Sequence, residues 1–283
     1  MSEIQNQTGS INDILKMMSR ASESFAFEIF IPSLKRSVMF RQMTTGQQKR
    51  LLKAIIDNPA YQTEFIFAFK QIITENCIET LSVDNLTIYD KLIIAITLRS
   101  MSIGNDLELE FAIPTKKNEE AQKIVRKINL KDLVDKALAE IRISPTTITD
   151  DLGIFEVFCD LPTISDEYRL EMEMRKNANV EIKNESELRD TVGEVFSSML
   201  VKYIKEVKIK EGDQLFTFDL KPLPFKDRLA IMGKLPTKVS NQIVNYINTV
   251  SKEFDKLTLF KETINGTEVE QRMKIDSSFF TPS

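Results

Sequence analysis

LTIYDKLIIAITLRSMSIGNDLELEF, residues 86–111, predicts a helix followed by a strand. Thr87 and Asp90 have the spacing of a capping box, which predicts a helix that begins there and ends near Gly104. Apolar residues cover most of the circumference of this helix, so we expect it to be buried rather than to lie on a surface. Apolar and acidic residues then alternate from Leu107 onward, which is typical of a strand with one outward face.

Upstream of this helix, the pattern predicts a strand, a turn and a second strand. Apolar residues alternate over residues 25–31, residues 32–35 form the turn, and residues 38–43 return as the second strand. A capping-box pattern then opens a helix over residues 47–57. A further apolar helix follows Pro59, where the missing N–H of proline costs nothing.

Downstream, shorter elements alternate as far as a polar segment. We expect a returning strand at 124–128, a short helix near 131–141, and strands at 141–144 and 154–159 separated by a Thr-rich, acidic turn at 145–153. The segment KNANVEIKNES, residues 176–186, is polar and rich in Asn, which makes it the best linker candidate.

Two apolar stripes at helical spacing follow the linker. The first runs from Leu188 to Val207, includes Ile204, and has Ser186 as its cap, so it predicts one continuous amphipathic helix. The second runs from Val239 to Leu257. The pair Asn265-Gly266 then lies between two strand-like runs, which is the sequence signal of a two-residue hairpin.

These patterns predict an α+β protein with three parts. Residues 1–24 form a polar N-terminal arm, and residues 25–180 form a mixed domain of strands and helices. Residues 186–283 form a mainly helical C-terminal region with a terminal hairpin and an aromatic tail. With 283 residues, 42% of them hydrophobic, the chain can bury a sizeable core.

Composition excludes much of enzyme chemistry. Histidine is absent, so Ser-His-Asp triads, Cys-His pairs and His-ligated metal sites cannot be built. The closest two of the eight glycines, Gly193 and Gly212, are 19 positions apart. The sequence therefore contains neither the P-loop motif GxxxxGK(S/T) nor the dinucleotide-binding motif GxGxxG. We therefore expect no catalytic site and no cofactor.

Charge and hydropathy narrow the class of protein further. The formal net charge of -4 lacks the cationic excess of nucleic-acid-binding proteins. The polar start of the chain does not resemble a secretory signal, and no apolar run reaches the roughly 20 residues of a membrane-spanning helix. Cys77 and Cys159 are far apart in sequence, and we interpret them as buried thiols. These features favour a cytosolic protein without a membrane span.

Carboxylates are the one remaining route to simple catalysis. Asp150, Asp151 and Asp160 offer oxygen ligands of the kind that a divalent cation requires. Adjacent acidic residues in a turn are more often solvated surface, so we expect no metal site here and keep a carboxylate-dependent metal enzyme as the rival hypothesis.

Two segments are candidates for partner binding. Phe279 and Phe280 are large aromatic residues in a polar terminal segment, and they must either fold back onto their own chain or insert into a partner. Ile14, Leu15 and Met18 share one face of a short helix that Ser10 and Asp13 could cap. That helix either packs on its own domain or docks on a partner.

Three stretches together resemble the baseplate hub subunit family of T-even-type contractile-tailed phages. They are IPSLKRSVMFRQMTTGQQKRLLKAI (31–55), LTIYDKLIIAITLRSMSIGNDLELEF (86–111) and IDSSFF (275–280). Some relatives carry paired cysteines after the glycine of the second stretch. Residues 111–128 contain none, so a metal-stabilised hairpin is not implied here.

The resemblance implies a non-enzymatic protein that acts in the assembly of the central baseplate hub. Its partners would be other hub or tail proteins, and its location would be the host cytoplasm during assembly or the baseplate of the virion. One alternative is a chaperone that holds the helical tape-measure protein against the apolar C-terminal stripes and is absent from the virion. The resemblance leaves the two roles open.

Overall fold

The computed structural model describes residues 10–23, 25–56, 62–113, 122–178, 193, 195–264, 266–276 and 278–281. Its helices are α1 (Ile11–Glu23), α2 (Thr45–Ile56), α3 (Thr63–Asn76), α4 (Ile88–Ser102), α5 (Leu130–Glu140), α6 (Ile164–Ala178), α8 (Phe225–Met232) and α9 (Thr237–Thr258). Its strands are β1 (Ala26–Ile31), β2 (Arg36–Arg41), β3 (Asp106–Ile113), β4 (Gln122–Asn129), β5 (Thr146–Thr149), β6 (Phe155–Cys159), β7 (Ile204–Glu211), β8 (Gln214–Asp219), β9 (Leu259–Ile264) and β10 (Thr267–Arg272). Mixed helices and small antiparallel sheets confirm the α+β class.

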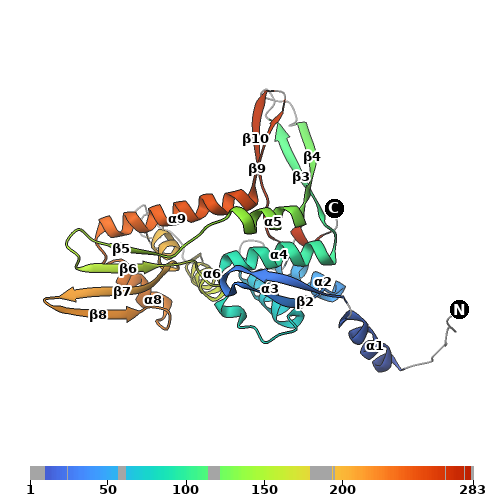
Figure 1. Cartoon of the computed structure of the whole chain (residues 1–283), viewed down its shortest axis with the longest axis horizontal. Helices are drawn as coiled ribbons and strands as arrows, with labels where there is room; N and C mark the ends of the chain where they lie inside the picture. Colours follow the sequence, from blue (N-terminus) through green and yellow to red (C-terminus); the bar gives the residue numbers. More distant parts are fainter. Residues whose placement is uncertain are drawn as a thin grey trace.

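The central helix α4 begins where the sequence predicts. Thr87 and Asp90 form the full capping box, and helices pack around the buried α4 in the body of the molecule (Figure 1). The second carboxylate oxygen of Asp90 accepts the backbone N–H of Ser33 at 2.9 Å. One buried Asp therefore caps α4 and also fixes the turn between β1 and β2, because its two oxygens serve different donors.

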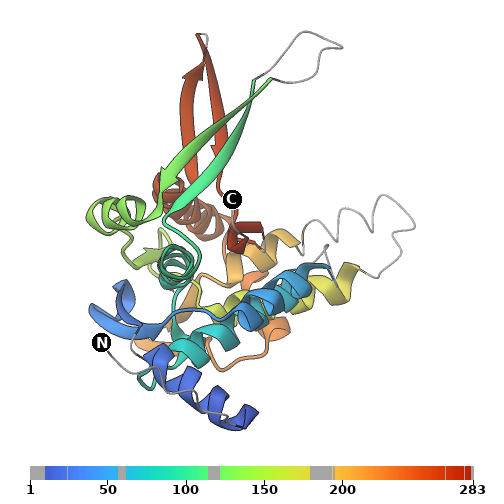
Figure 2. The same cartoon turned by 90° about the vertical axis from the view of Figure 1, so that its right-hand side faces the viewer.

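Antiparallel pairs make up all the sheets of the described residues. Three are two-stranded, namely β1–β2, β3–β4 and β9–β10, and one has the order β5-β6-β7-β8. The hairpins β3–β4 and β9–β10 rise side by side from the body in both views (Figures 1 and 2). An ion pair of Arg126 with Glu262, 2.7 Å apart, joins them. The terminal hairpin β9–β10 confirms the prediction for its two strands and for a turn at Gly266, while Asn265 lies outside the described residues.

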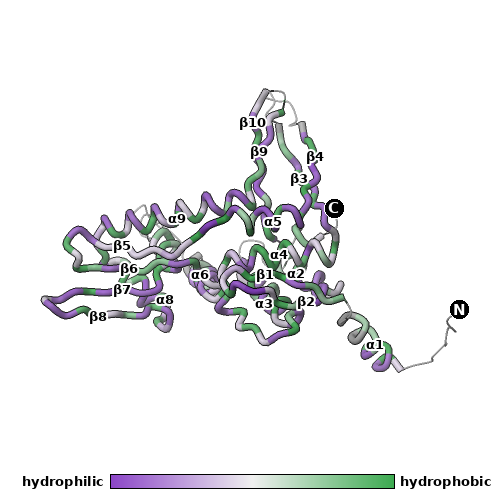
Figure 3. The backbone as a smooth tube through the Cα atoms, viewed as in Figure 1, coloured by the Kyte–Doolittle hydropathy of each residue, from purple (hydrophilic) through white to green (hydrophobic). Residues whose placement is uncertain are grey.

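Two hydrophobic clusters form the interior, and α9 belongs to both. The first surrounds α3 and α4 and includes Val250 and Leu257 of α9. The second lies against the four-stranded sheet and includes Val239 and Ile243. Hydrophobic residues recur along α9 and concentrate at α4 (Figure 3). The apolar stripe predicted for residues 239–257 is thus a core-facing stripe, as its helical spacing requires.

Three elements differ from the sequence predictions. Ile204 and Val207 belong to strand β7, so the continuous helix predicted from Leu188 to Val207 is wrong at its C-terminal end; helix covers residues 195–201. Ser186 and Leu188 lie outside the described residues. The strand expected at 141–144 is instead β5 in the Thr-rich segment, and the first residues of the predicted linker, 176–178, belong to α6.

The four-stranded sheet joins segments from both sides of the predicted linker. β6 pairs with β7 in antiparallel register, so the ranges 25–180 and 186–283 share one sheet. The C-terminal segment in turn packs into the cluster around α3 and α4. The division into an arm and two domains stays a prediction.

Candidate interaction surfaces

The aromatic tail folds back into the first hydrophobic cluster. Phe279 and Phe280 are fully buried, and their rings meet edge to face with centroids 5.2 Å apart. Phe280 also packs against the rings of Phe65 and Phe69 on α3, at 6.3 and 5.7 Å. Of the two alternatives open from the sequence, the structure places the tail on its own chain, where burial in the cluster removes both rings from water.

Polar contacts fix the backbone of this tail. The Arg99 Nε donates to the carbonyl oxygen of Phe279 at 2.8 Å, and its guanidinium lies 5.6 Å from the centroid of the Phe279 ring. The Gln48 Nε2 donates to the carbonyl oxygen of Phe280 at 2.6 Å. Burial lowers the pKa of Arg99, against the attraction of Asp106. The tail is therefore held by hydrogen bonds from α2 and α4 in addition to its two rings.

The apolar face of α1 is exposed. Ser10 and Asp13 cap the helix as the sequence predicts, with the Ser10 hydroxyl donating to Asp13 at 2.8 Å. Ile14, Leu15 and Met18 are 52%, 57% and 64% exposed. In Figure 1, α1 lies at the periphery of the molecule. An amphipathic helix in this position presents its apolar side to solvent, which is typical of a segment that docks on another surface.

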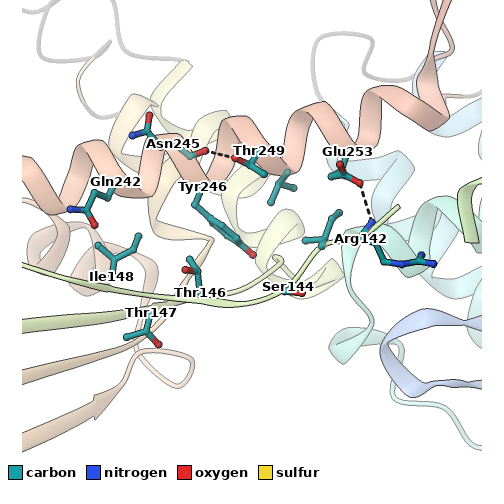
Figure 4. A pocket seen from close by; sticks show the side chains of 12 residues that line it. Arg142, Ser144, Thr146, Thr147, Ile148, Gln242, Asn245, Tyr246, Thr249 and Glu253 are labelled. Atoms are coloured by element: carbon teal, nitrogen blue, oxygen red, sulfur yellow. Dashed lines mark hydrogen bonds between the residues drawn. The ribbon is translucent and has the colours of Figure 1, made fainter. Parts of the chain in front are cut away.

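An open pocket of mixed polar and apolar lining lies between α9 and residues 142–148 (Figure 4). Its volume is about 500 Å³, and hydroxyl and amide side chains form much of its wall. Tyr246 reaches into it from α9, and its buried hydroxyl has no hydrogen-bond partner among the described residues. At one end, the backbone N–H of Arg142 donates to Glu253 at 3.0 Å. The wall thus combines hydroxyl, amide and apolar side chains with the charged residues Arg142 and Glu253.

The candidate metal carboxylates do not converge. Asp150 accepts backbone N–H groups of Phe155 and Leu152, and the first of these holds the pKa of its carboxyl below the ordinary value. Asp151 pairs with Lys238, and Asp160 accepts the N–H of Leu161. Within the part of the chain that the structure describes, no three potential ligands gather around a common point. These carboxylates order turns and strand ends.

A buried charge network lies where α6, β7 and α8 meet, and sequence reasoning missed it. Asp166 receives Lys205 Nζ at 2.6 Å and Arg228 Nη1 at 3.0 Å, and all three side chains are buried. Burial alone would raise the pKa of Asp166, but the Lys205 ammonium and the hydrogen bonds from Lys205, Thr163 and Arg228 lower it to about 2. Burial lowers the pKa of Lys205, against the attraction of Asp166. Both cations also donate to backbone carbonyls, so the network connects three elements.

A known protein family matches most of the folded chain. The family model described as T4 bacteriophage base plate protein matches residues 23–280. This match covers most of the chain, from the end of α1 to the aromatic tail, and the chain therefore belongs to this family of phage baseplate proteins. Neither a curated protein nor a solved structure matches the chain. Along the described residues, no helix combines the length and hydrophobicity needed to cross a bilayer.

Proposed function

We propose that this chain is a non-enzymatic component or assembly factor of the central baseplate hub, and that it acts through protein–protein contacts. Membership of the baseplate family supports a role among tail proteins. The observation that carries the proposal further is the exposed apolar face of α1, formed by Ile14, Leu15 and Met18. The partner that fits it is a tail protein with an apolar groove, because helix-in-groove docking uses anchors at this spacing.

Burial makes the two tail phenylalanines a poorer anchor for a partner than the α1 face. Phe279 and Phe280 are buried in their own fold, so a partner could reach them only after the tail had left its site. The α1 face is open without any rearrangement of the body. We therefore assign partner binding to α1 and a structural role to the two tail rings.

A matched pair of variants tests the role of α1. The first changes Ile14, Leu15 and Met18 to Gln, and the control changes Asn12 and Lys16, on the polar side of the helix, to Gln. Gln is a good helix former, so both variants keep the helix while only the first removes its apolar face. We expect tagged wild type and control to capture tail proteins from infected cells, and the first variant to lose them. Equal capture by all three would contradict the proposal.

The alternative role is that of a chaperone that binds the tape-measure protein. The stripe of α9 that would hold a helical partner is buried against the chain's own clusters, so this role would need another surface. Mass spectrometry of purified virions distinguishes the two roles. The protein is present in virions if it is a hub subunit, and absent from them, while still capturing tail proteins from cells, if it is an assembly chaperone.

A further inference from the structure

Strand β8 is an open edge of the four-stranded sheet. It is the last strand in the order β5-β6-β7-β8, and it is the outermost strand of the sheet in Figure 1. Every residue from Gln214 to Asp219 is exposed, including Leu215 (60%), Phe216 (40%) and Phe218 (48%). Folded proteins commonly protect such edges with charges, proline or a covering element. Between Gln214 and Phe218 this strand has none of these protections within the described structure.

The backbone groups that point outward from β8 follow from one hydrogen bond. The N–H of Leu220 donates to the carbonyl oxygen of Lys205, so Leu220 faces β7. Backbone groups of successive residues alternate between the two sides of an antiparallel strand. Phe216 and Phe218 therefore face β7, while the N–H and C=O groups of Leu215, Thr217 and Asp219 face away from the sheet.

The side chains of the same strand divide by face. Phe216 and Phe218 lie opposite Ile209 and Val207 of β7, on the face whose inner part is buried against the second hydrophobic cluster. An additional strand beside β8 would extend this apolar face and cover the two exposed rings. The edge thus offers, to the same incoming strand, an apolar surface and backbone groups that have no strand partner among the described residues.

We propose that β8 pairs with β8 of a second copy of this chain in antiparallel orientation, with Thr217 opposite Thr217 at a twofold axis. In this register all three outward-facing residues find partners, since Thr217 pairs with its own copy and Leu215 pairs with Asp219. Phe216 then lies opposite Phe218 in a non-hydrogen-bonded pair, where side chains approach most closely. The two sheets become one continuous sheet of eight strands.

Charge favours this register over the one centred on Phe216. Just beyond the two ends of β8, Asp213 in the turn before the strand would approach Lys221 after the strand of the other copy, twice by symmetry. A shift of the partner by two residues, centred on Phe216, places Asp213 opposite Asp219 and sets like charges against each other. The backbone at Lys221 is held in place, because Arg228 Nη2 donates to its carbonyl oxygen at 2.6 Å. The second copy is thus the occupant whose charges fit the edge.

Sedimentation of the purified full chain from roughly 1 to 100 µM tests the dimer. We expect a reversible dimer. Asp213→Lys and Lys221→Asp, each alone, place like charges at both ends and should raise the dimer Kd roughly tenfold or more. The double variant D213K/K221D restores opposite charges and should return the Kd towards that of wild type. Because both positions are exposed, none of these changes removes a buried contact.

A backbone variant tests the strand pairing itself. Thr217→Pro removes only the N–H that points outward, which an edge strand tolerates, whereas Thr217→Val keeps that N–H and the strand preference. We expect the proline variant to be monomeric with an intact fold by circular dichroism, and the valine variant to dimerise. A chain that is monomeric throughout the concentration range, or a dimer that responds to none of the β8 changes, would overturn the proposal. So would a dimer that only the α1 variants disrupt.

Discussion

The Nε of Arg99 donates a hydrogen bond of 2.8 Å to the carbonyl oxygen of Phe279, across 180 positions of the chain. The Nη1 of the same guanidinium donates to the carbonyl oxygen of Gly104 at 2.6 Å. One buried cation therefore fixes both the end of α4 and the aromatic tail. A charged donor makes a stronger hydrogen bond to a buried carbonyl than a neutral donor does. The Arg99 guanidinium therefore satisfies two backbone acceptors and holds the tail in position.

The tail is expected to contribute strongly to stability. Phe280→Ala removes a fully buried ring that packs on Phe65 and Phe69, and it should lower the free energy of unfolding by about 3–5 kcal/mol. Urea unfolding followed by circular dichroism measures this change. Phe25→Ala, at an exposed ring, is the matched control and should cost well under that amount. Equal effects at the two positions would show that the tail does not fill the core.

The network around Asp166 should make stability depend on acid. The pKa of Asp166 is about 2 in the folded protein against an ordinary value of 3.8. Its contribution, about 2 kcal/mol, is therefore fully present above about pH 4 and is lost as the pH falls through about 2. Unfolding experiments across this range should show the loss in wild type.

Asp166→Asn tests the assignment of this acid dependence. It leaves Lys205 and Arg228 buried without their counter-ion and should cost about 3–5 kcal/mol at neutral pH. Stability should then depend less on pH between 4 and 2 than it does in wild type. Asp227→Asn, at an exposed position of α8, is the control and should change neither quantity appreciably. An unchanged acid slope in the Asp166 variant would assign the slope to other carboxylates.

The turn between β7 and β8 depends on a left-handed residue. Gly212 has a φ of 60°, so Gly212→Ala should destabilise the hairpin by about 1 kcal/mol although no atom obstructs the added methyl group. Gly46→Ala, within α2, is the matched control and should be neutral or slightly stabilising, because alanine favours a helix. Thermal unfolding of both variants compares them directly. A loss at position 46 equal to that at 212 would remove the conformational explanation.

The two thiols should differ in reactivity. Burial raises the pKa of the Cys159 thiol to about 12, and it also raises the pKa of the half-buried Cys77. Since the thiolate is the reactive form, we expect an aromatic disulfide reagent to modify Cys77 slowly in the native protein, faster at higher pH, and Cys159 only after unfolding. In Cys77→Ala no thiol should react before unfolding. Rapid native reaction of that variant would contradict the burial of Cys159.

The sequence pattern predicts the structure correctly where residues close together in the chain determine it. The capping boxes at Thr87 and at Ser10 and the hairpin turn at Gly266 follow from contacts between near neighbours in the chain. Such contacts need no knowledge of distant segments. The exposure of Ile14, Leu15 and Met18 could not be predicted in this way, because it depends on what else the chain offers to cover them.

The segment around Ile204 and Val207 shows where local rules fail. Both residues are buried although they are three apart, a spacing that indicates a helix and not a regular strand. The register of β6 against β7 shifts between Phe158 and Cys159, and this irregularity brings both residues to the interior. The pair Gly212-Asp213 between two apolar runs was the available signal for a hairpin. The charge network of Asp166, Lys205 and Arg228 had no such signal, because its members are distant in sequence.

Burial of the tail rings also constrains the order of folding. The cluster around α3 and α4 is built mainly from the first half of the chain, yet Phe280 occupies its interior. The faces of Phe65 and Phe69 that pack on Phe280 therefore stay uncovered until this segment docks. Contacts of such long sequence separation also slow the final closure. Docking of these two phenylalanines therefore completes a core that the first half of the chain begins.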